Sequence, residues 1–170
     1  MRVPNDLQFD TDAYLLFSIY YEAYGLLEGM DESAATFMKR FAKQIRATGQ
    51  VLEWLGLAIA NKNSPLGWKP SHDLMSLIAK PHKRSNSKKP GASAEDNEVF
   101  DMILDAAVGE LEDDSNIANF VASVLTGLGL MARGCDGCDY IPTKKLRWLA
   151  FEQRQKERHL REEERRVKSA

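Results

Sequence analysis

The sequence predicts a mainly α-helical fold with two short β-hairpins, built from two related units. Three observations lead to this prediction. Apolar residues recur at helical spacing in both halves, each half contains a Leu-Gly-Leu segment followed by a loop, and each loop is followed by a Pro-Ser or Pro-Thr pair that opens another apolar helical pattern. Because these signals occur twice in the same order, we interpret them as an internal duplication.

The composition is that of an ordinary globular protein. The chain has 170 residues, of which 44% are hydrophobic and 28% are charged, and this balance argues against global disorder. The length suits one domain or two small ones. We divide the chain into a first unit (residues 12–80), a basic polar linker (81–97), a second unit (98–151) and a charged helical tail (152–170).

The first helix is expected to begin at one of three N-cap candidates, Asp10, Thr11 or Asp12, and to end near Gly29. Its apolar residues follow one helical stripe: Leu16, Ile19, Tyr20, Ala23 and Leu27. Ser33 is expected to cap a second helix with the stripe Ala34, Phe37, Met38, Phe41 and Ile45. Thr48 and Gly49 are expected to interrupt it, so that a short third helix spans residues 50–55.

A hairpin and a further helix complete the first unit. Residues 56–60 read as an apolar strand, and the loop from Asn61 to Gly67 has the composition of a turn. Trp68 begins the return strand. Pro70 and Ser71 start a helix that carries Asp73 in its first turn, where an acid favours the helix dipole.

The second unit repeats the pattern after the linker, which is too polar to bury a face. Its first stripe lies 84 residues after that of the first unit, at Phe100, Ile103, Leu104, Ala107 and Leu111. Residues 128–130 repeat the Leu-Gly-Leu of residues 55–57 at an offset of 73, so the first unit holds 84 − 73 = 11 extra residues before its hairpin. We expect this insert to hold an additional helix.

The longest uncharged run, residues 115–132, raises the question of a membrane span. It contains Asn116, Asn119, Ser123 and Thr126, so we interpret it as a buried amphipathic helix that runs into a strand. We therefore expect no membrane partner. The tail beyond Glu152 is nearly all charged and is expected to be a helix that projects into solvent.

The helices followed by a hairpin, with Leu-Gly-Leu-Met-Ala-Arg-Gly and then Tyr-Ile-Pro-Thr-Lys-Lys-Leu, resemble winged-helix domains. In that family a Gly-Leu pair opens the first wing strand, a glycine-containing turn forms the tip, and a Thr-Pro or similar pair starts the following helix. The matching positions are Gly129, Leu130, Gly137, Tyr140, Pro142 and Thr143. The resemblance covers residues 15–79 and 100–151. A winged helix has three helices before the wing, whereas the second unit shows only two.

The resemblance implies nucleic-acid binding or protein contact, and the fold class alone does not choose between them. Phosphates are neutralised by clustered Lys and Arg. The candidate DNA-binding residues are Lys39, Arg40, Lys43, Gln44 and Arg46, with Lys83, Arg84, Lys88 and Lys89 as an additional arm. The alternative is a protein–protein module or homodimer, in which the basic helix balances acids such as Glu22, Glu28, Asp101 or Asp105.

The two cysteines, Cys135 and Cys138, form a single C-x-x-C. They are weak metal candidates, because zinc needs four ligands and the three histidines lie at no finger-like spacing. We favour a hairpin turn at Asp136-Gly137 with the cysteines opposed at its tip, which permits a disulfide without requiring one.

No nucleotide-binding or nucleophile motif occurs in the sequence. We therefore expect neither enzyme activity nor a cofactor. Two cysteines make no disulfide framework, and the N-terminal residues lack the layout of a signal peptide. The expected compartment is therefore the cytoplasm.

Overall fold

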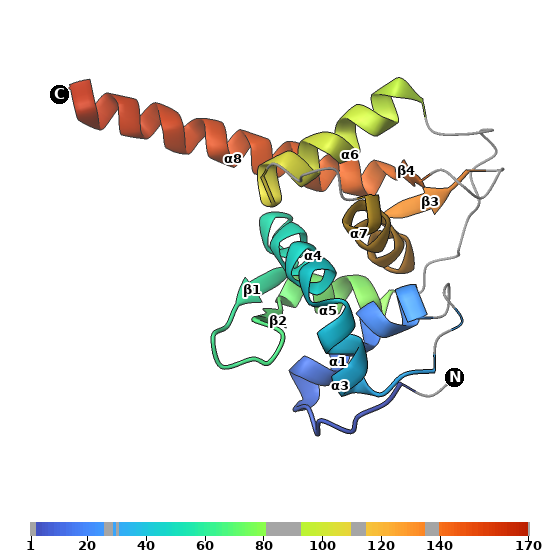
Figure 1. Cartoon of the computed structure of the whole chain (residues 1–170). Helices are drawn as coiled ribbons and strands as arrows, with labels where there is room; N and C mark the ends of the chain where they lie inside the picture. Colours follow the sequence, from blue (N-terminus) through green and yellow to red (C-terminus); the bar gives the residue numbers. More distant parts are fainter. Residues whose placement is uncertain are drawn as a thin grey trace.

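Helices form most of the protein, and two antiparallel hairpins lie at its sides (Figure 1). The structure is a computed structural model, and it describes residues 3–25, 29, 31–80, 93–109, 115–134 and 140–169. The predicted fold class, mainly α-helical with short hairpins, is confirmed.

The first half opens with helix α1 (Thr11–Tyr20), which continues as a π-helical turn, η1 (Tyr21–Gly25). The carboxylate of Asp10 caps α1 by accepting a hydrogen bond from the backbone N–H of Ala13 at 2.8 Å. Helix α3 (Ala34–Arg40) begins after Ser33, whose hydroxyl accepts from the N–H of Thr36. The sequence predicts the Ser33 cap and offers Asp10 as one of three candidates for the first, because a cap depends on a side chain only a few residues away.

The helix that follows corrects the sequence-based boundaries. Helix α4 runs from Ala42 to Trp54 without interruption, so the predicted break at Thr48 and Gly49 is wrong. The Thr48 hydroxyl donates to the carbonyl of Gln44 within the helix, at 2.7 Å. Gly49 is needed for packing, since a Cβ there would lie 2.3 Å from the ring of Trp68. The break comes instead at Phe41, which separates α3 from α4.

The first hairpin pairs β1 (Ala58–Ala60) with β2 (Trp68–Pro70), and α5 (His72–Ala79) follows it. The second half contains α6 (Ala94–Ala107), α7 (Ser115–Gly127), the hairpin of β3 (Met131–Arg133) and β4 (Tyr140–Pro142), and α8 (Lys144–Ser169). The uncharged run therefore folds as a helix and then a strand, as predicted.

Helix α6 begins inside the range 81–97 that the sequence had suggested as linker. Ser93 and Asp96 form a capping box: the Ser93 hydroxyl accepts from the N–H of Asp96, and the Asp96 carboxylate accepts from the N–H of Ser93 at 2.9 Å. This reciprocal cap starts the helix among polar residues. The preceding part of the range, residues 81–92, lies outside the described residues.

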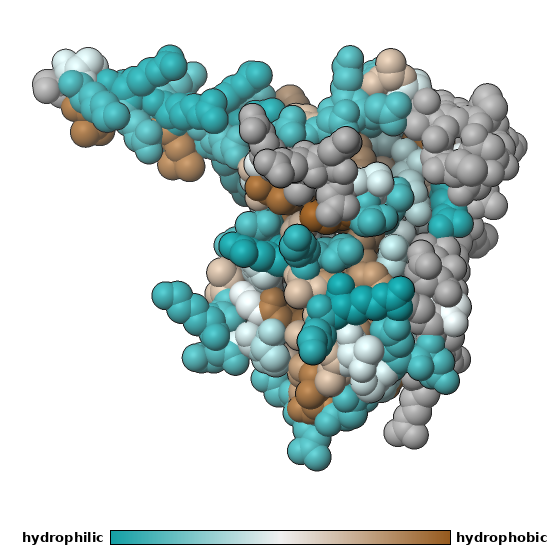
Figure 2. Space-filling view, viewed as in Figure 1, coloured by the Kyte–Doolittle hydropathy of each residue, from teal (hydrophilic) through white to brown (hydrophobic). Residues whose placement is uncertain are grey.

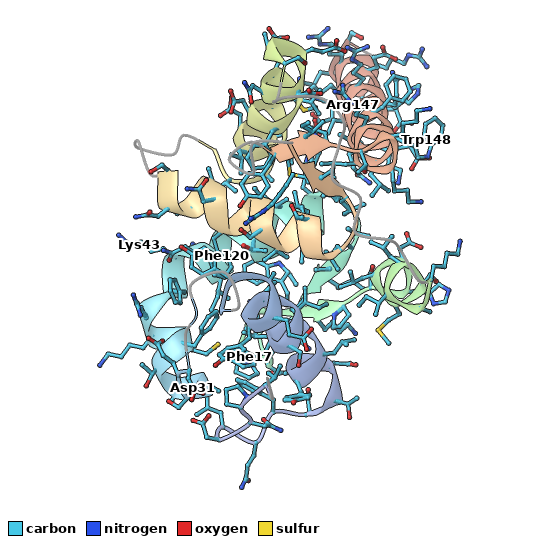
Figure 3. All side chains as sticks on the ribbon, turned by 90° about the vertical axis from the view of Figure 1, so that its right-hand side faces the viewer. Phe17, Asp31, Lys43, Phe120, Arg147 and Trp148 are labelled. Carbon is cyan, nitrogen blue, oxygen red and sulfur yellow. The ribbon has the colours of Figure 1, made fainter. Side chains whose placement is uncertain are left out.

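The two halves share one hydrophobic core. Helices α4 and α7 pack against each other at its centre, α4 also contacts α6, and α7 contacts η1. Phe120 of α7 lies among aromatic rings of the first half, with centroids 4.7 Å from Tyr24 and 5.8 Å from Phe41. Figure 3 shows Phe120 close to the helices of the first half.

The two hairpin junctions have the same hydrogen-bonding pattern. Gly56 and Gly129 both adopt positive φ, at 78° and 76°. The N–H of Leu57 donates to the carbonyl of Leu52 at 2.7 Å, and the N–H of Leu130 donates to that of Leu125 at 2.8 Å. At the other end of each hairpin, the N–H groups of Ser71 and Thr143 donate to the carbonyls of Leu57 and Leu130, both at 3.0 Å.

Helix α8 extends well beyond the body of the protein (Figure 1). Its first turns are anchored by the buried residues Leu146 and Ala150. On the face shown in Figure 2 its far end is mostly hydrophilic, with isolated hydrophobic residues along the lower edge. Among the described residues, no helix is both long and apolar enough to cross a membrane.

Candidate functional site

The predicted basic residues lie on two consecutive helices. Lys39 and Arg40 occupy the last turn of α3, whereas Lys43 and Arg46 lie in the first turns of α4. All four side chains are exposed, and Gln44 is half-buried. The five predicted residues of the first unit therefore lie on either side of Phe41, on two consecutive helices. The four predicted residues of the linker fall outside the described residues: Lys83, Arg84, Lys88 and Lys89.

Arg40 differs from the other basic residues because it has an acidic partner. Its guanidinium lies 2.6 Å from a carboxylate oxygen of Glu32 and 5.2 Å from the ring centroid of Phe41. Part of its charge is thus neutralised within the chain.

No acid within the described residues lies at ion-pair distance from Lys39, Lys43 or Arg46. The sequence explains part of this, because no Asp or Glu occurs between Ser33 and Leu52. Glu22, Asp101 and Asp105, the described acids considered as partners, form no ion pair with these bases. The basic side chains are all exposed, and within the described residues three of them have no acidic side chain at ion-pair distance.

The rest of α4 is committed to packing. One side of the helix is buried against α6, α7 and β1, through residues that include Ile45, Thr48, Val51 and Leu52. Lys43, Arg46 and Glu53 are exposed along the opposite edge. The accessible edge of α4 therefore changes sign along its length, from basic at the N-terminal end to acidic at Glu53.

Trp68 closes the acidic end of this edge. Its ring packs over Gly49, and its indole N–H donates to the carboxylate of Glu53 at 3.3 Å. The sequence places Trp68 at the start of a strand but does not predict this contact. The one available signal was Gly49, a glycine within a helical pattern, which indicates that another group packs closely against the helix there. No Lys or Arg follows Arg46 in α4, so the basic surface of these helices is confined to α3 and the first two turns of α4. We call this surface the basic face and define it by Lys39, Arg40, Lys43 and Arg46.

An N-terminal segment holds the opposite end of α3. The carboxylate of Asp6 accepts hydrogen bonds from the N–H groups of Ala34 at 2.6 Å and Ala35 at 3.3 Å. The bond from Ala34 is the main reason why the pKa of Asp6 is lowered. This acid lies at the start of α3, whereas the basic face begins at its end.

A partly buried ion pair connects α6 with α8. The carboxylate of Asp96, which is only 1% exposed, receives a hydrogen bond from the guanidinium of Arg147. Arg147 also lies 3.6 Å from the exposed carboxylate of Glu95. The two partners are 51 residues apart, so sequence spacing gave no signal for this pair. Its role is to hold the start of α6 against the first turns of α8.

Two other features offer no chemistry of their own. Burial raises the pKa of Tyr20, whose hydroxyl has no hydrogen-bond partner among the described residues, so this phenol stays neutral in the core. The described residues also hold no cluster of three or more His, Cys, Asp or Glu suited to a metal ion. Cys135 and Cys138 lie outside the described residues.

No protein-family model, curated protein or solved structure matches this chain. The basic face and the exposed surfaces of the helices are therefore the features of this chain that bear on its function.

Proposed function

We propose that this protein is a non-enzymatic nucleic-acid-binding protein that contacts the phosphates of duplex DNA through its basic face. The observation that carries the proposal is the joint exposure of Lys39, Lys43 and Arg46 without acidic partners among the described residues. Exposed cations of this kind release counterions from DNA when they neutralise phosphates.

The winged-helix resemblance supports this proposal. We propose that the two halves are duplicated winged-helix-like units, because both hairpin junctions share a positive-φ glycine and the same backbone hydrogen bonds. In such a unit, the helix before the hairpin is the one that approaches DNA. In the first unit this helix is α4, which carries Lys43 and Arg46.

The geometry favours phosphate contact over deep insertion into the major groove. A helix-turn-helix motif usually has a turn of three or four residues, but only Phe41 separates α3 from α4. Trp68 and Glu53 also occupy the C-terminal end of the α4 edge. Binding of this kind depends little on sequence, and we expect a Kd on the order of 10⁻⁵ M at physiological salt.

Fluorescence anisotropy with random-sequence duplex DNA, across a salt series, tests the proposal. We expect binding that weakens steeply as salt rises, and its loss in the Lys43→Glu/Arg46→Glu variant. The matched control is Lys156→Glu/Arg158→Glu, which makes the same charge change at exposed positions of α8. It should leave most of the affinity intact.

Absence of binding at low salt would overturn the DNA proposal, as would equal losses in the two variants. Either result would favour the second candidate function, a protein–protein interaction module. That candidate is favoured by a different observation, the exposed aromatic residues of α8.

A further inference from the structure

The outer side of α8 carries two large aromatic side chains in solvent. Trp148 is 56% exposed and Phe151 is 55% exposed. They are three residues apart and therefore lie on the same side of the helix, where their rings stack with centroids 6.3 Å apart. The opposite side is anchored in the body by Leu146 and Ala150. Clustered exposed apolar residues of this kind mark interaction sites.

Trp148 of this aromatic pair points away from Lys43 of the basic face. In Figure 3, Trp148 points outward from α8 on the side remote from α6 and α7, and Lys43 lies at the opposite side of the view. The two surfaces can therefore be occupied at the same time, and the inference below does not depend on the proposed function.

One flank of the aromatic pair carries two opposite charges. Lys145 and Glu152 are seven residues apart, which is close to two helical turns, so they lie on the same flank before and after the rings. Lys145 is exposed and Glu152 is half-buried. Within the described chain, neither has an oppositely charged side chain at ion-pair distance.

The other flank is basic, but its charges already have acidic neighbours. Arg147 is bound to Asp96 and lies near Glu95, and Arg154 lies 3.9 Å from a carboxylate oxygen of Glu157. The acidic neighbours offset part of the charge of Arg147 and Arg154. If this flank meets the same flank of another copy, the repulsion between the two is therefore reduced.

We propose that this surface binds a second copy of the chain, with the two α8 helices packed antiparallel on their outer sides. A two-fold axis between residues 149 and 150 sets Trp148 of each copy opposite Phe151 of the other. The same axis brings Lys145 of each copy beside Glu152 of the other. Each favourable contact is thus made twice, as in any two-fold interface.

The charge pattern favours a second copy over a strand of nucleic acid. A strand of nucleic acid could stack its bases on Trp148 and Phe151, but Glu152 would repel its phosphates. A second copy satisfies Lys145 and Glu152 together. Since the apolar centre is small, we expect a weak dimer with a Kd on the order of 10 µM.

Sedimentation velocity of the full chain over a wide dilution series measures the dimer directly. Trp148→Ala should raise the dimer Kd about thirtyfold, because each copy loses a central aromatic residue. The matched control is Leu160→Ala, which removes a side chain that is 60% exposed on the opposite side of the same helix. This control should leave the dimer Kd unchanged. Circular dichroism of each variant checks that its helix content is retained.

A charge swap tests the antiparallel arrangement. Lys145→Glu and Glu152→Lys should each raise the dimer Kd about tenfold, because each places like charges together at both symmetric contacts. The double variant restores opposite charges and should recover the wild-type Kd. A merely structural effect of either residue would not be rescued in this way.

The proposal is overturned if the chain is monomeric at every concentration. It is also overturned if Trp148→Ala leaves the dimer Kd unchanged, or if the double charge variant does not recover the wild-type Kd. Single-stranded oligonucleotides provide the remaining arm. If they bind the monomer and lose affinity on Trp148→Ala, the surface belongs to nucleic acid and the dimer proposal fails. The Lys43→Glu/Arg46→Glu variant should keep the dimer, which separates this result from failure of the DNA proposal.

Discussion

The two hairpin–helix segments start in the same way and end very differently. At both junctions a serine or threonine hydroxyl caps the helix, with Ser71 accepting from the N–H of Leu74 and Thr143 from that of Leu146. Yet α5 has 8 residues and α8 has 26. The junction geometry is local and is shared by both segments, whereas the length of the helix depends on the residues that follow.

The longer helix gains contacts that the shorter one lacks. Helix α8 reaches the first half, where the indole N–H of Trp54 donates to the carboxylate of Glu157 at 2.7 Å. In α5, by contrast, Leu74 is the buried residue, and Met75 and Ile78 remain exposed. The second segment thus ties the two halves together, and the first one ends soon after its hairpin.

The Asp96–Arg147 pair provides the largest test of this difference. Asp96→Ala should lower the free energy of unfolding by about 3 kcal/mol, because it breaks a partly buried ion pair and a capping box. In the first half, Asp12 corresponds to Asp96 at the offset of 84 residues, and Met75 corresponds to Arg147 at the offset of 72 residues. Both are exposed, and they form no such pair. Asp12→Ala should therefore cost about 0.5 kcal/mol or less. Urea unfolding of both variants measures the contrast, and equal losses would contradict it.

A smaller effect is expected where a helix meets a hairpin. Gly49→Ala should cost about 2 kcal/mol, since the new Cβ would lie 2.3 Å from the ring of Trp68. At the corresponding positions the second half has Ala122 and Tyr140, at offsets of 73 and 72. The double variant Gly49→Ala/Trp68→Tyr copies that pair, and we expect it to recover part of the loss in urea unfolding. If the double variant were less stable than Gly49→Ala, the two sites would not be equivalent.

The smallest effect concerns the start of α3. The lowered pKa of Asp6 means that folding favours its ionised form, so its contribution is present above the ordinary value of 3.8 and is lost as the pH falls through the lower folded pKa. Asp6→Asn should therefore be less stable than the wild type at neutral pH, and the difference should shrink below about pH 4. Thermal unfolding across this pH range measures the difference. A difference independent of pH would argue against the carboxylate–N–H contacts.

Local features were predictable from the sequence, and long-range contacts were not. The cap at Ser33, the start of α1 near Asp10 and the positions of both hairpins follow from residues that are close in the chain. The continuity of α4 was not predicted, because the glycine at position 49 is required by the packing of Trp68, which lies 19 residues later in the chain.

The candidate site shows the same limit. The basic residues could be named from the sequence, because no acid interrupts them between Ser33 and Leu52. Their common exposure, and the use of Glu32 by Arg40 alone among them, required the fold. The aromatic pair of α8 could not be separated from core residues, since Trp148 and Phe151 lie in the same amphipathic segment as the buried Leu146.

The position of Phe120 has a consequence for how the chain folds and how it could have evolved. Its ring is fully buried among residues of the other half, including Tyr24 and Phe41. Neither half can open without exposing aromatic surface of the other, so we expect one cooperative unfolding transition for both. If the halves descend from one ancestral unit, that unit would have needed a second copy of itself to cover the same surface.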